Sequence, residues 1–327
     1  MEYGRLGTSG LKVSKVALGC MSFGDGRRAT WSLNAEAAEP IFRKAVELGI
    51  TFWDTANVYG YGSSEQIVGE AITKYTSRDQ VVLATKLVNA MPEGGPGAQG
   101  SSRKAVMQQI DNSLRRLGTD YVDLYQIHRF DFHTPVEETM EALHDVVKAG
   151  KARYLGASSM YAWQFATLQH AADLGGWTRF VSMQDQYNLL QREEEREMFG
   201  LLAHQGVGSI PWSPLAGGKV ARPWGETGTK RSESSGETDQ YGRPLFRDAD
   251  PQVVAAVQQV AEERGVSMAQ VGLAWVMRNR VVSSTIVGAT KPEHLADAAA
   301  AVDIDLTDDE VARLEEHYET RLPTYFT

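Results

Sequence analysis

Short apolar segments alternate with longer amphipathic segments along most of the chain. Each short segment has the length of a buried β-strand, and each longer one repeats apolar residues every three or four positions, as helices that pack on a sheet do. Several of the longer segments end at a glycine, which is typical of helix C-termini. The predicted strands are 16–19, 51–54, 81–86, 122–128, 154–158, 180–184, 208–212 and 284–288. The predicted helices are 35–49, 64–76, 101–117, 135–149, 161–174, 192–205, 251–264, 267–279, 291–301 and 307–321.

This order of elements predicts an α/β fold of the (β/α)8 TIM-barrel type. Apolar strands that are each followed by an amphipathic helix need a parallel sheet covered by helices, and eight such units close most naturally into a barrel. The alternative is an open, doubly wound sheet. It is disfavoured because no GxGxxG motif follows the first strand.

Three additions to the barrel are predicted, and we expect residues 1–327 to form a single domain. Residues 2–16 alternate around a turn signal and predict an N-terminal β-hairpin. Segment 307–321 begins with a capping-box pattern and predicts an extra C-terminal helix. The polar, glycine-rich stretch 215–250 follows the seventh strand, and a loop of that length is usually a lid, a binding loop or disordered.

Composition narrows the classes of partner. The net charge is -9 without a long run of one sign, so nucleic acid and anionic membranes are not expected partners. No stretch approaches the ~20 apolar residues that span a bilayer. Cys20 is the single cysteine, and the first residues lack a basic segment followed by a long apolar one. We therefore expect a cytoplasmic protein.

Reactive side chains fall at the ends of three consecutive strands. Asp54, Lys86 and His128 close the second, third and fourth predicted strands, and Tyr59 lies in the loop after Asp54. Alone, the carboxylate could cap a helix, the lysine could be a solvated strand end and the histidine could be a satisfied core residue. In a barrel of this kind, however, chemistry occurs where strands end, so all four groups are predicted to face one mouth.

These residue types suit the reduction of a carbonyl group. A phenol is a poor acid at neutral pH, but a nearby ammonium group favours its phenolate and lowers its pKa. A carboxylate next to the ammonium keeps it charged and in place. An imidazole can hydrogen-bond a substrate oxygen and orient it. Together they polarise an oxygen and donate a proton to it while a hydride comes from an external source.

At these residues the sequence resembles the aldo-keto reductase superfamily over nearly its whole length. DTANVYGYGSSE (54–65) is similar to that family's DTAxxYGxSE segment, and LGTDYVDLYQIH (117–128) is similar to its LGxDYVDLxxxH signature. RPWG (222–225) and MQDQYNLLQREEEREM (183–198) resemble the aryl-alcohol-dehydrogenase-like branch, and within it a bacterial reductase.

The resemblance implies a barrel that binds NADP(H) without a Rossmann unit. It makes Tyr59 the general acid, Lys86 and Asp54 the partners that tune its pKa, and His128 the group that orients the carbonyl. It implies no metal site. Matching cofactor positions, from the nicotinamide end to the phosphate end, are Ser158, Ser159, Gln184, Trp212, Ser213, Leu215, Gly217, Gly218, Lys219, Gly288, Lys291 and His294.

The segment after the eighth strand departs from the family's usual pattern. Ala289 and His294 stand where many members carry serine and arginine against the 2′-phosphate, and Ala298 stands where many carry asparagine. Lys291 supplies one positive charge, and the helix that starts near Pro292 offers backbone N–H groups to an anion. NADPH is therefore expected over NADH, with weaker discrimination.

Two other functions fit parts of the pattern. The chain could be a cofactor-binding, redox-sensing module that resembles potassium-channel β-subunits, although no docking segment is apparent. It could also be a lyase in which Lys86 attacks a carbonyl to form a Schiff base.

For a reductase, the expected partner is a small carbonyl substrate of open identity, and the oligomeric state is also open. Substrate contacts are expected from residues 21–23, Tyr61, residues 129–132, Met160 and the loop 215–250. Within that loop, Trp224, Tyr241 and Phe246 line an apolar pocket or fasten the loop to the barrel. Arg129 and Lys219 either favour an anionic substrate or are solvated.

Overall fold

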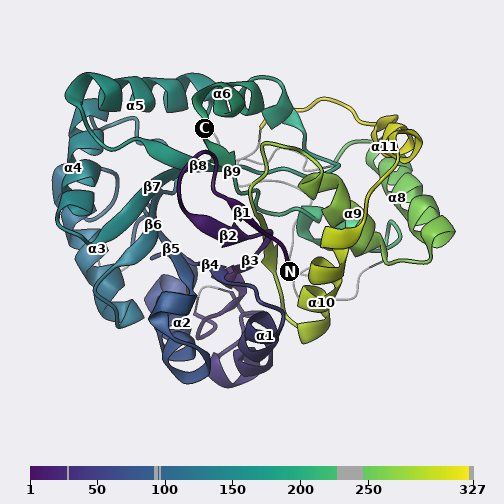
Figure 1. Cartoon of the computed structure of the whole chain (residues 1–327), viewed down its shortest axis with the longest axis horizontal. Coiled ribbons are helices and arrows are strands. Elements are labelled where there is room, and N and C mark those ends of the chain that lie inside the picture. Colours follow the sequence, from purple (N-terminus) through teal and green to yellow (C-terminus); the bar gives the residue numbers. More distant parts are fainter. Residues whose placement is uncertain (28, 92–94, 96, 227–245, 324–327) are drawn as a thin grey trace.

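A parallel β-barrel forms the centre of the molecule, as predicted (Figure 1). The computed structural model describes the chain except for residues 28, 92–94, 96, 227–245 and 324–327. Eight strands pair in the order β10-β3-β4-β5-β6-β7-β8-β9, every pair parallel. They are β3 (Val16–Gly19), β4 (Phe52–Asp54), β5 (Val82–Leu87), β6 (Val122–Ile127), β7 (Ala152–Ser158), β8 (Phe180–Gln184), β9 (Gly208–Ser209) and β10 (Thr285–Gly288).

The first and last strands of this order meet, which closes the sheet. A parallel bridge joins Ser209 to Val282, and the backbone N–H of Ile286 donates to the carbonyl of Pro211 over 2.9 Å. Closure leaves the barrel without a free edge.

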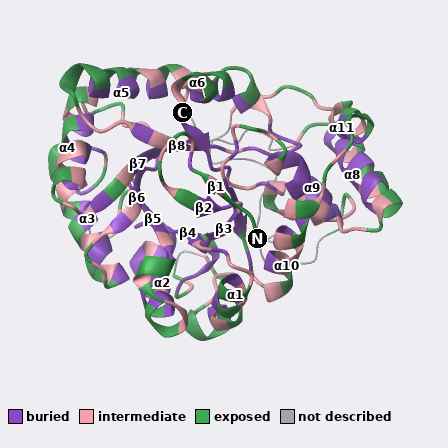
Figure 2. Cartoon of the chain, in the orientation of Figure 1, coloured by how far each residue is buried: buried purple, intermediate pink, exposed green. Residues whose placement is uncertain are grey.

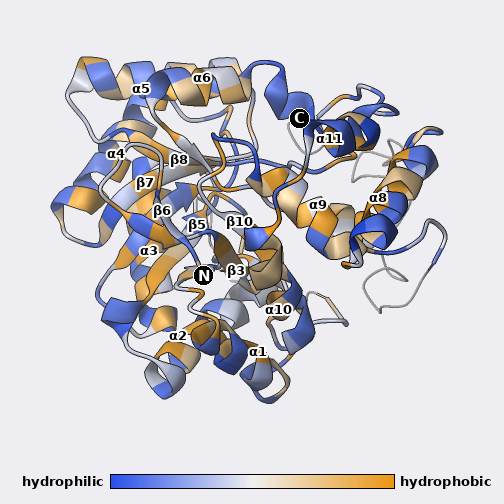
Figure 3. Ribbon diagram, turned by 45° about the vertical axis from the view of Figure 1, so that its right-hand side comes forward, coloured by the Kyte–Doolittle hydropathy of each residue, from blue (hydrophilic) through white to orange (hydrophobic). Residues whose placement is uncertain are grey.

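Helices surround the barrel (Figures 2 and 3). They are α1 (Ala35–Glu47), α2 (Ser63–Tyr75), α3 (Arg103–Leu117), α4 (Val136–Lys148), α5 (Ala162–Gly175), α6 (Met198–Gln205), α8 (Asp250–Arg264), α9 (Met268–Met277), α10 (Pro292–Ala300) and α11 (Asp308–Glu315). Of these, α8 and α11 pack outside α9. Helix α9 is buried along its length because α8, α10 and a 3-10 segment, η5 (Ala216–Ala221), pack around it. None of the described helices is both long and apolar enough to cross a membrane.

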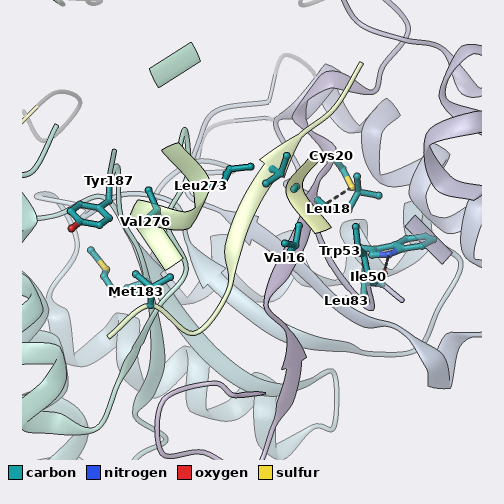
Figure 4. Packing of buried hydrophobic residues seen from close by; sticks show 14 of the residues in the cluster. Val16, Leu18, Cys20, Ile50, Trp53, Leu83, Met183, Tyr187, Leu273 and Val276 are labelled. Atoms are coloured by element: carbon teal, nitrogen blue, oxygen red, sulfur yellow. Dashed lines mark hydrogen bonds between the residues drawn. The ribbon is translucent and has the colours of Figure 1, made fainter. Parts of the chain in front are cut away.

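The main core lies between the sheet and the helices (Figure 4). Trp53 at the centre of β4 is fully buried, and its indole N–H donates to the carbonyl of Ile50 over 2.8 Å. Its ring packs on Phe42 of α1, with the ring centroids 5.2 Å apart. Cys20 is buried in the same layer, and burial raises the pKa of its thiol well above the ordinary value, which makes the thiolate scarce.

The predicted hairpin lies across the end of the barrel at which the strands begin. It consists of β1 (Tyr3–Arg5) and β2 (Lys12–Ser14), which pair antiparallel. Leu6 and Val13 pack against the apolar residues that the strands turn into the barrel, among them Phe52. The hairpin therefore closes this end, and the opposite end remains for the site.

Most elements differ from the predicted bounds by only a few residues, but three lose a large part of their expected length. The strand 208–212 ends at Ser209, because Pro211 has no N–H to donate to a neighbouring strand. The helix 192–205 begins only at Met198; before it, Glu193–Glu195 form a 3-10 turn (η4), where Arg192 pairs with Glu195 and Glu315.

The last predicted helix, 307–321, ends at Glu315. Beyond it the hydroxyl of Tyr318 donates to Glu193 over 2.7 Å, and Arg321 pairs with Asp250 at 2.6 Å. These tertiary contacts replace the last turn of the helix. The predicted loop 215–250 begins with η5 and ends where α8 starts, and its central part, including Tyr241, lies outside the described residues.

Candidate active site

The loop after β4 turns sharply to present Tyr59. Gly60, Tyr61 and Gly62 all have positive φ angles, of 53°, 52° and 93°. A left-handed tyrosine is disfavoured unless the surrounding structure holds it, so this conformation is characteristic of functional loops. A Cβ on Gly60 would lie 3.2 Å from the Cα of Gly24, so the loop packs closely on the chain after β3. Tyr59 is held 9% exposed.

Lys86 connects Asp54 to Tyr59. Its ammonium group donates to Oδ1 of Asp54, to the backbone carbonyl of Thr55 over 2.9 Å and to the hydroxyl of Tyr59 over 3.4 Å. Lys86 is fully buried and Asp54 is 2% exposed. Burial by itself lowers the pKa of Lys86, but the charge of Asp54 and the bonds to Asp54 and Tyr59 outweigh burial and raise it above the ordinary value. The lysine is therefore held as the ammonium ion beside the phenol.

The second carboxylate oxygen of Asp54 has two donors of its own. The side-chain amides of Gln126 and Gln184 donate to Oδ2 over 2.9 and 3.0 Å. The carboxylate is thus bonded on both oxygens. A buried charge with this many partners has a fixed orientation.

His128 faces Tyr59 from the neighbouring strand end. Their rings meet edge to face with centroids 5.7 Å apart. Nδ1 of His128 lies 2.9 Å from the amide nitrogen of Asn89, which can only donate, so Nδ1 accepts and a neutral ring carries its proton on Nε2. His128 is 8% exposed. Of the four reactive side chains, Tyr59 and His128 are the most exposed.

The residues expected at the nicotinamide end lie together on β7, β8 and the chain after β9. Ser158 donates to the backbone carbonyl of Gln184 over 3.0 Å. The indole N–H of Trp212 donates to the hydroxyl of Ser159 over 3.0 Å, which fixes the plane of the indole. Because the side chain of Gln184 also bonds Asp54, this group adjoins the four reactive side chains.

The residues expected at the pyrophosphate form one tight loop. Ser213, Ala216, Gly217 and Gly218 have positive φ angles of 54°, 51°, 66° and 96°. A Cβ on Gly217 would meet no atom within 4 Å, so this turn faces open space that a phosphate could enter. Leu215 instead packs inward, where the missing Cβ of Gly272 on α9 makes room for it.

Lys219 has a more specific place than the sequence indicated. Its ammonium group lies over the rings of Trp224 and Phe246, 5.3 and 4.9 Å from their centroids. The two rings meet edge to face, and Phe246 packs against the main core. These contacts fasten the loop to the barrel, which was one of the two alternatives for these aromatic residues.

The phosphate-end residues lie at the N-terminus of α10. Lys291 is its N-cap and makes no capping bond with its side chain, and Gly288 ends β10 just before it. Burial, the charge of Lys291 and that of Arg222 lower the pKa of His294, so its imidazole is neutral at physiological pH. Arg222 also lies beside Gly218, where a Cβ would be 3.0 Å from Nη2. Two positive charges and an uncapped helix N-terminus fit an anion such as a nucleotide phosphate.

The expectation of substrate contacts needs correction at Phe23. It is fully buried and packs on Phe42 with ring centroids 4.7 Å apart. Met160 is buried too, but it lines a cavity. Met21 and Phe132 are 38% and 61% exposed. The cavity that Met160 lines has a volume of about 580 Å³ and is also lined by Tyr161 and residues of η4, whereas none of the four reactive groups lines it.

Three residues of the site were not singled out from the sequence for a role. Gln126 bonds Asp54, and Asn89 bonds His128. Arg222 adds a positive charge that acts on His294 of α10. A signal existed for Gln126, because it alternates with Leu124 and His128 and therefore faces the barrel interior with them. No comparable pattern marks Asn89, which lies in a loop.

Known proteins resemble this chain over nearly its whole length. A profile of the Aldo/keto reductase family matches residues 15–319. The versiconal hemiacetal acetate reductase of Aspergillus parasiticus is 44% identical over 335 residues, which cover 97% of each chain. An aldo-keto reductase of Alternaria alternata is 43% identical over 98% of this chain and 92% of its own. A protein of Schizosaccharomyces pombe named as an aryl-alcohol dehydrogenase is 41% identical over 97% of this chain and 95% of its own. The chain therefore belongs to the aldo/keto reductase family.

Proposed function

We propose that this protein is an NADPH-dependent reductase of aldehydes or ketones, which runs in reverse on alcohols when the cofactor is oxidised. The observation that carries the proposal is the buried contact of Lys86 with both Asp54 and Tyr59. A lysine kept charged next to a phenol, at the mouth of a barrel, is an arrangement for moving a proton to an oxygen.

Each side chain has a part in the proposed reaction. The Nε2–H of His128 donates a hydrogen bond to the carbonyl oxygen and orients it toward the hydroxyl of Tyr59. Tyr59 gives its proton to that oxygen, and the charge left on the phenolate is stabilised by Lys86. Asp54 balances the lysine and keeps it in place. The bound cofactor supplies the hydride to the carbonyl carbon.

Four residues support a nicotinamide site beside this centre. Gln184, Ser158 and Ser159 offer polar groups for a carboxamide, and the indole of Trp212 is a flat surface held in a fixed plane. At the other end, Lys291 and Arg222 would meet a 2′-phosphate near the N-terminus of α10. Their charges favour NADPH over NADH.

An aromatic substrate is the class that the site's surroundings favour. Phe130, two residues after His128, has its ring centroid 5.0 Å from that of Phe132 and 5.9 Å from that of Trp163 on α5. Phe132 and Trp163 are more than half exposed. Flat apolar surface of this kind stacks with aromatic rings. A relative named as an aryl-alcohol dehydrogenase is consistent with this choice.

Two competing functions are less well supported. The raised pKa of Lys86 keeps it protonated, whereas a Schiff base requires the neutral amine. A redox sensor needs only a bound cofactor, yet the site also contains a positioned proton donor.

Fluorescence titration with NADPH and with NADH tests the proposal, followed by a panel of aromatic and aliphatic aldehydes at saturating cofactor. Tight binding of NADPH, with its oxidation by a member of the panel, is expected. Binding without oxidation by any carbonyl would favour the sensor, and the absence of binding would exclude both.

A further inference from the structure

Gln126 is a fully buried polar residue inside the barrel. It lies on β6, where it is in register with Lys86 on one side and Gly156 on the other. Buried amides are nearly always hydrogen-bonded, so the partners of Gln126 indicate what it does.

Those partners are Asp54 and Gln184. The amide nitrogen of Gln126 donates to Oδ2 of Asp54 over 2.9 Å, and its carbonyl oxygen accepts from the amide of Gln184 over 3.2 Å. Gln184 also donates to the same oxygen of Asp54, over 3.0 Å. The three side chains form a closed triangle, while Lys86 holds the other oxygen of Asp54.

The barrel leaves space for this amide at Gly156. A Cβ there would lie 3.1 Å from Cγ of Gln126 and 2.5 Å from the hydroxyl of Ser182. An alanine at this position would press on the Gln126 side chain. Glycine on β7 therefore makes room for glutamine on β6.

We propose that Gln126 is a positioning residue that couples the proton-transfer group to the cofactor site. Through its N–H it keeps the carboxylate of Asp54 aimed at Lys86, and through its oxygen it holds the amide of Gln184 in place. This role rests on the reductase function proposed above. Gln126 touches neither Tyr59 nor the expected carbonyl position in this scheme; it acts through Asp54 and Gln184.

The Gln126→Met variant tests the coupling, because methionine keeps the length and removes both hydrogen bonds. Loss of a hydrogen bond to a charged group predicts a fall in kcat of roughly 10- to 100-fold. The KM for the aldehyde should stay the same. Because Gln184 would be held less firmly, the affinities for NADPH and for NADH should fall by the same factor, since both cofactors carry the nicotinamide.

The Gln126→Glu variant supplies a readout that a merely structural role would not change. The introduced carboxyl group would lie next to the Asp54 carboxylate, and two such groups cannot both stay ionised. When protonated, it can donate to Asp54 as the amide does. We therefore expect kcat relative to wild type to be highest at low pH and to fall as pH rises. The same loss at every pH would overturn the proposal.

Gln169→Met is the matched control. Gln169 is 1% exposed on α5 and bonds the backbone N–H and carbonyl of Phe180 over 2.9 and 3.1 Å, away from the reactive groups. It should lower thermal stability but leave kcat and cofactor affinity within about twofold of wild type. Circular dichroism checks that each variant folds, and if Gln126→Met does not fold, the pH profile of Gln126→Glu decides.

The wild-type protein, measured in the same assays, separates the proposed reductase function from the proposed role of Gln126. A wild type that reduces a carbonyl, with Gln126→Met unchanged in kcat and cofactor affinity, would overturn only the role of Gln126. A wild type that binds no cofactor would overturn the reductase function and this role together.

Discussion

The side-chain amide of Asn89 donates a hydrogen bond to Nδ1 of His128 over 2.9 Å. Because an amide nitrogen has no acceptor capacity, this contact selects the imidazole tautomer with its proton on Nε2. That proton is the one a substrate oxygen would meet. A loop residue after β5 thus sets the chemistry of a residue at the end of β6.

Asn89→Ala should therefore reduce turnover without affecting cofactor binding. Without the amide, the ring can rotate and adopt the other tautomer, and the loss of one hydrogen bond predicts a fall in kcat of about tenfold. Steady-state kinetics with the aldehyde that the wild type reduces fastest measures this fall in kcat. Asn112→Ala on α3 is the control and should match wild type. Full activity of Asn89→Ala would mean that another group orients His128.

Tyr59→Phe should retain NADPH binding and lose most turnover. Phenylalanine keeps the ring against His128 but removes the proton donor, and general acid catalysis contributes roughly 10²- to 10⁴-fold. Fluorescence titration and single-turnover kinetics separate binding from chemistry. Tyr61→Phe, which changes the neighbouring phenol, should stay near wild type. Turnover that survives in Tyr59→Phe and fails in Tyr61→Phe would transfer the acid role to Tyr61.

The barrel was predictable from the sequence because burial repeats in it with a simple period. The strands 16–19 and 180–184 match β3 and β8 at both ends, since an apolar run between turn signals leaves little choice. The prediction erred where tertiary contacts compete with local preference. The capping box at Thr307 fixed the start of α11, but the contacts of Tyr318 and Arg321 decided where it ends.

The same distinction holds at the site. Asp54, Lys86 and His128 were visible because they close consecutive strands, and the sheet register brings such positions to one rim. Their supporting residues were harder to find. Asn89 bonds His128 from a loop, and the charge of Arg222 acts on His294 of α10 from a different loop, so neither follows a period in the sequence.

Lys291→Ala should lower the affinity for NADPH more than the affinity for NADH. Lys291 is exposed at the N-cap of α10. Burial is the largest cause that lowers the pKa of His294, and it persists in this variant together with the charge of Arg222, so histidine does not replace the missing charge near neutral pH. Loss of one charge-assisted contact predicts roughly a tenfold weaker affinity for NADPH. Titration with both cofactors at pH 7.5 measures the ratio, and Lys148→Ala on α4 is the control. An equal loss with both cofactors would remove Lys291 from the 2′-phosphate site.

Asp185→Asn should stabilise the protein, and more so at high pH. Burial raises the pKa of Asp185 to about 7, and only its Oδ2 accepts a bond among the described residues, from Ser209 over 3.0 Å. In the unfolded chain an aspartate has a pKa of ~4, so between pH 4 and pH 7 folding takes up a proton. The wild type therefore loses stability as pH rises from 4 to 7.

Asparagine removes this loss of stability, which is absent below pH 4 and complete above pH 7. Urea unfolding should show that the variant gains roughly 2 to 3 kcal/mol more at pH 8 than at pH 5. Asp173→Asn is the control, since it changes an exposed partner of Arg179 and should show the same small effect at both pH values. If the gain for Asp185→Asn does not grow with pH, the buried carboxyl group is charged in the folded protein.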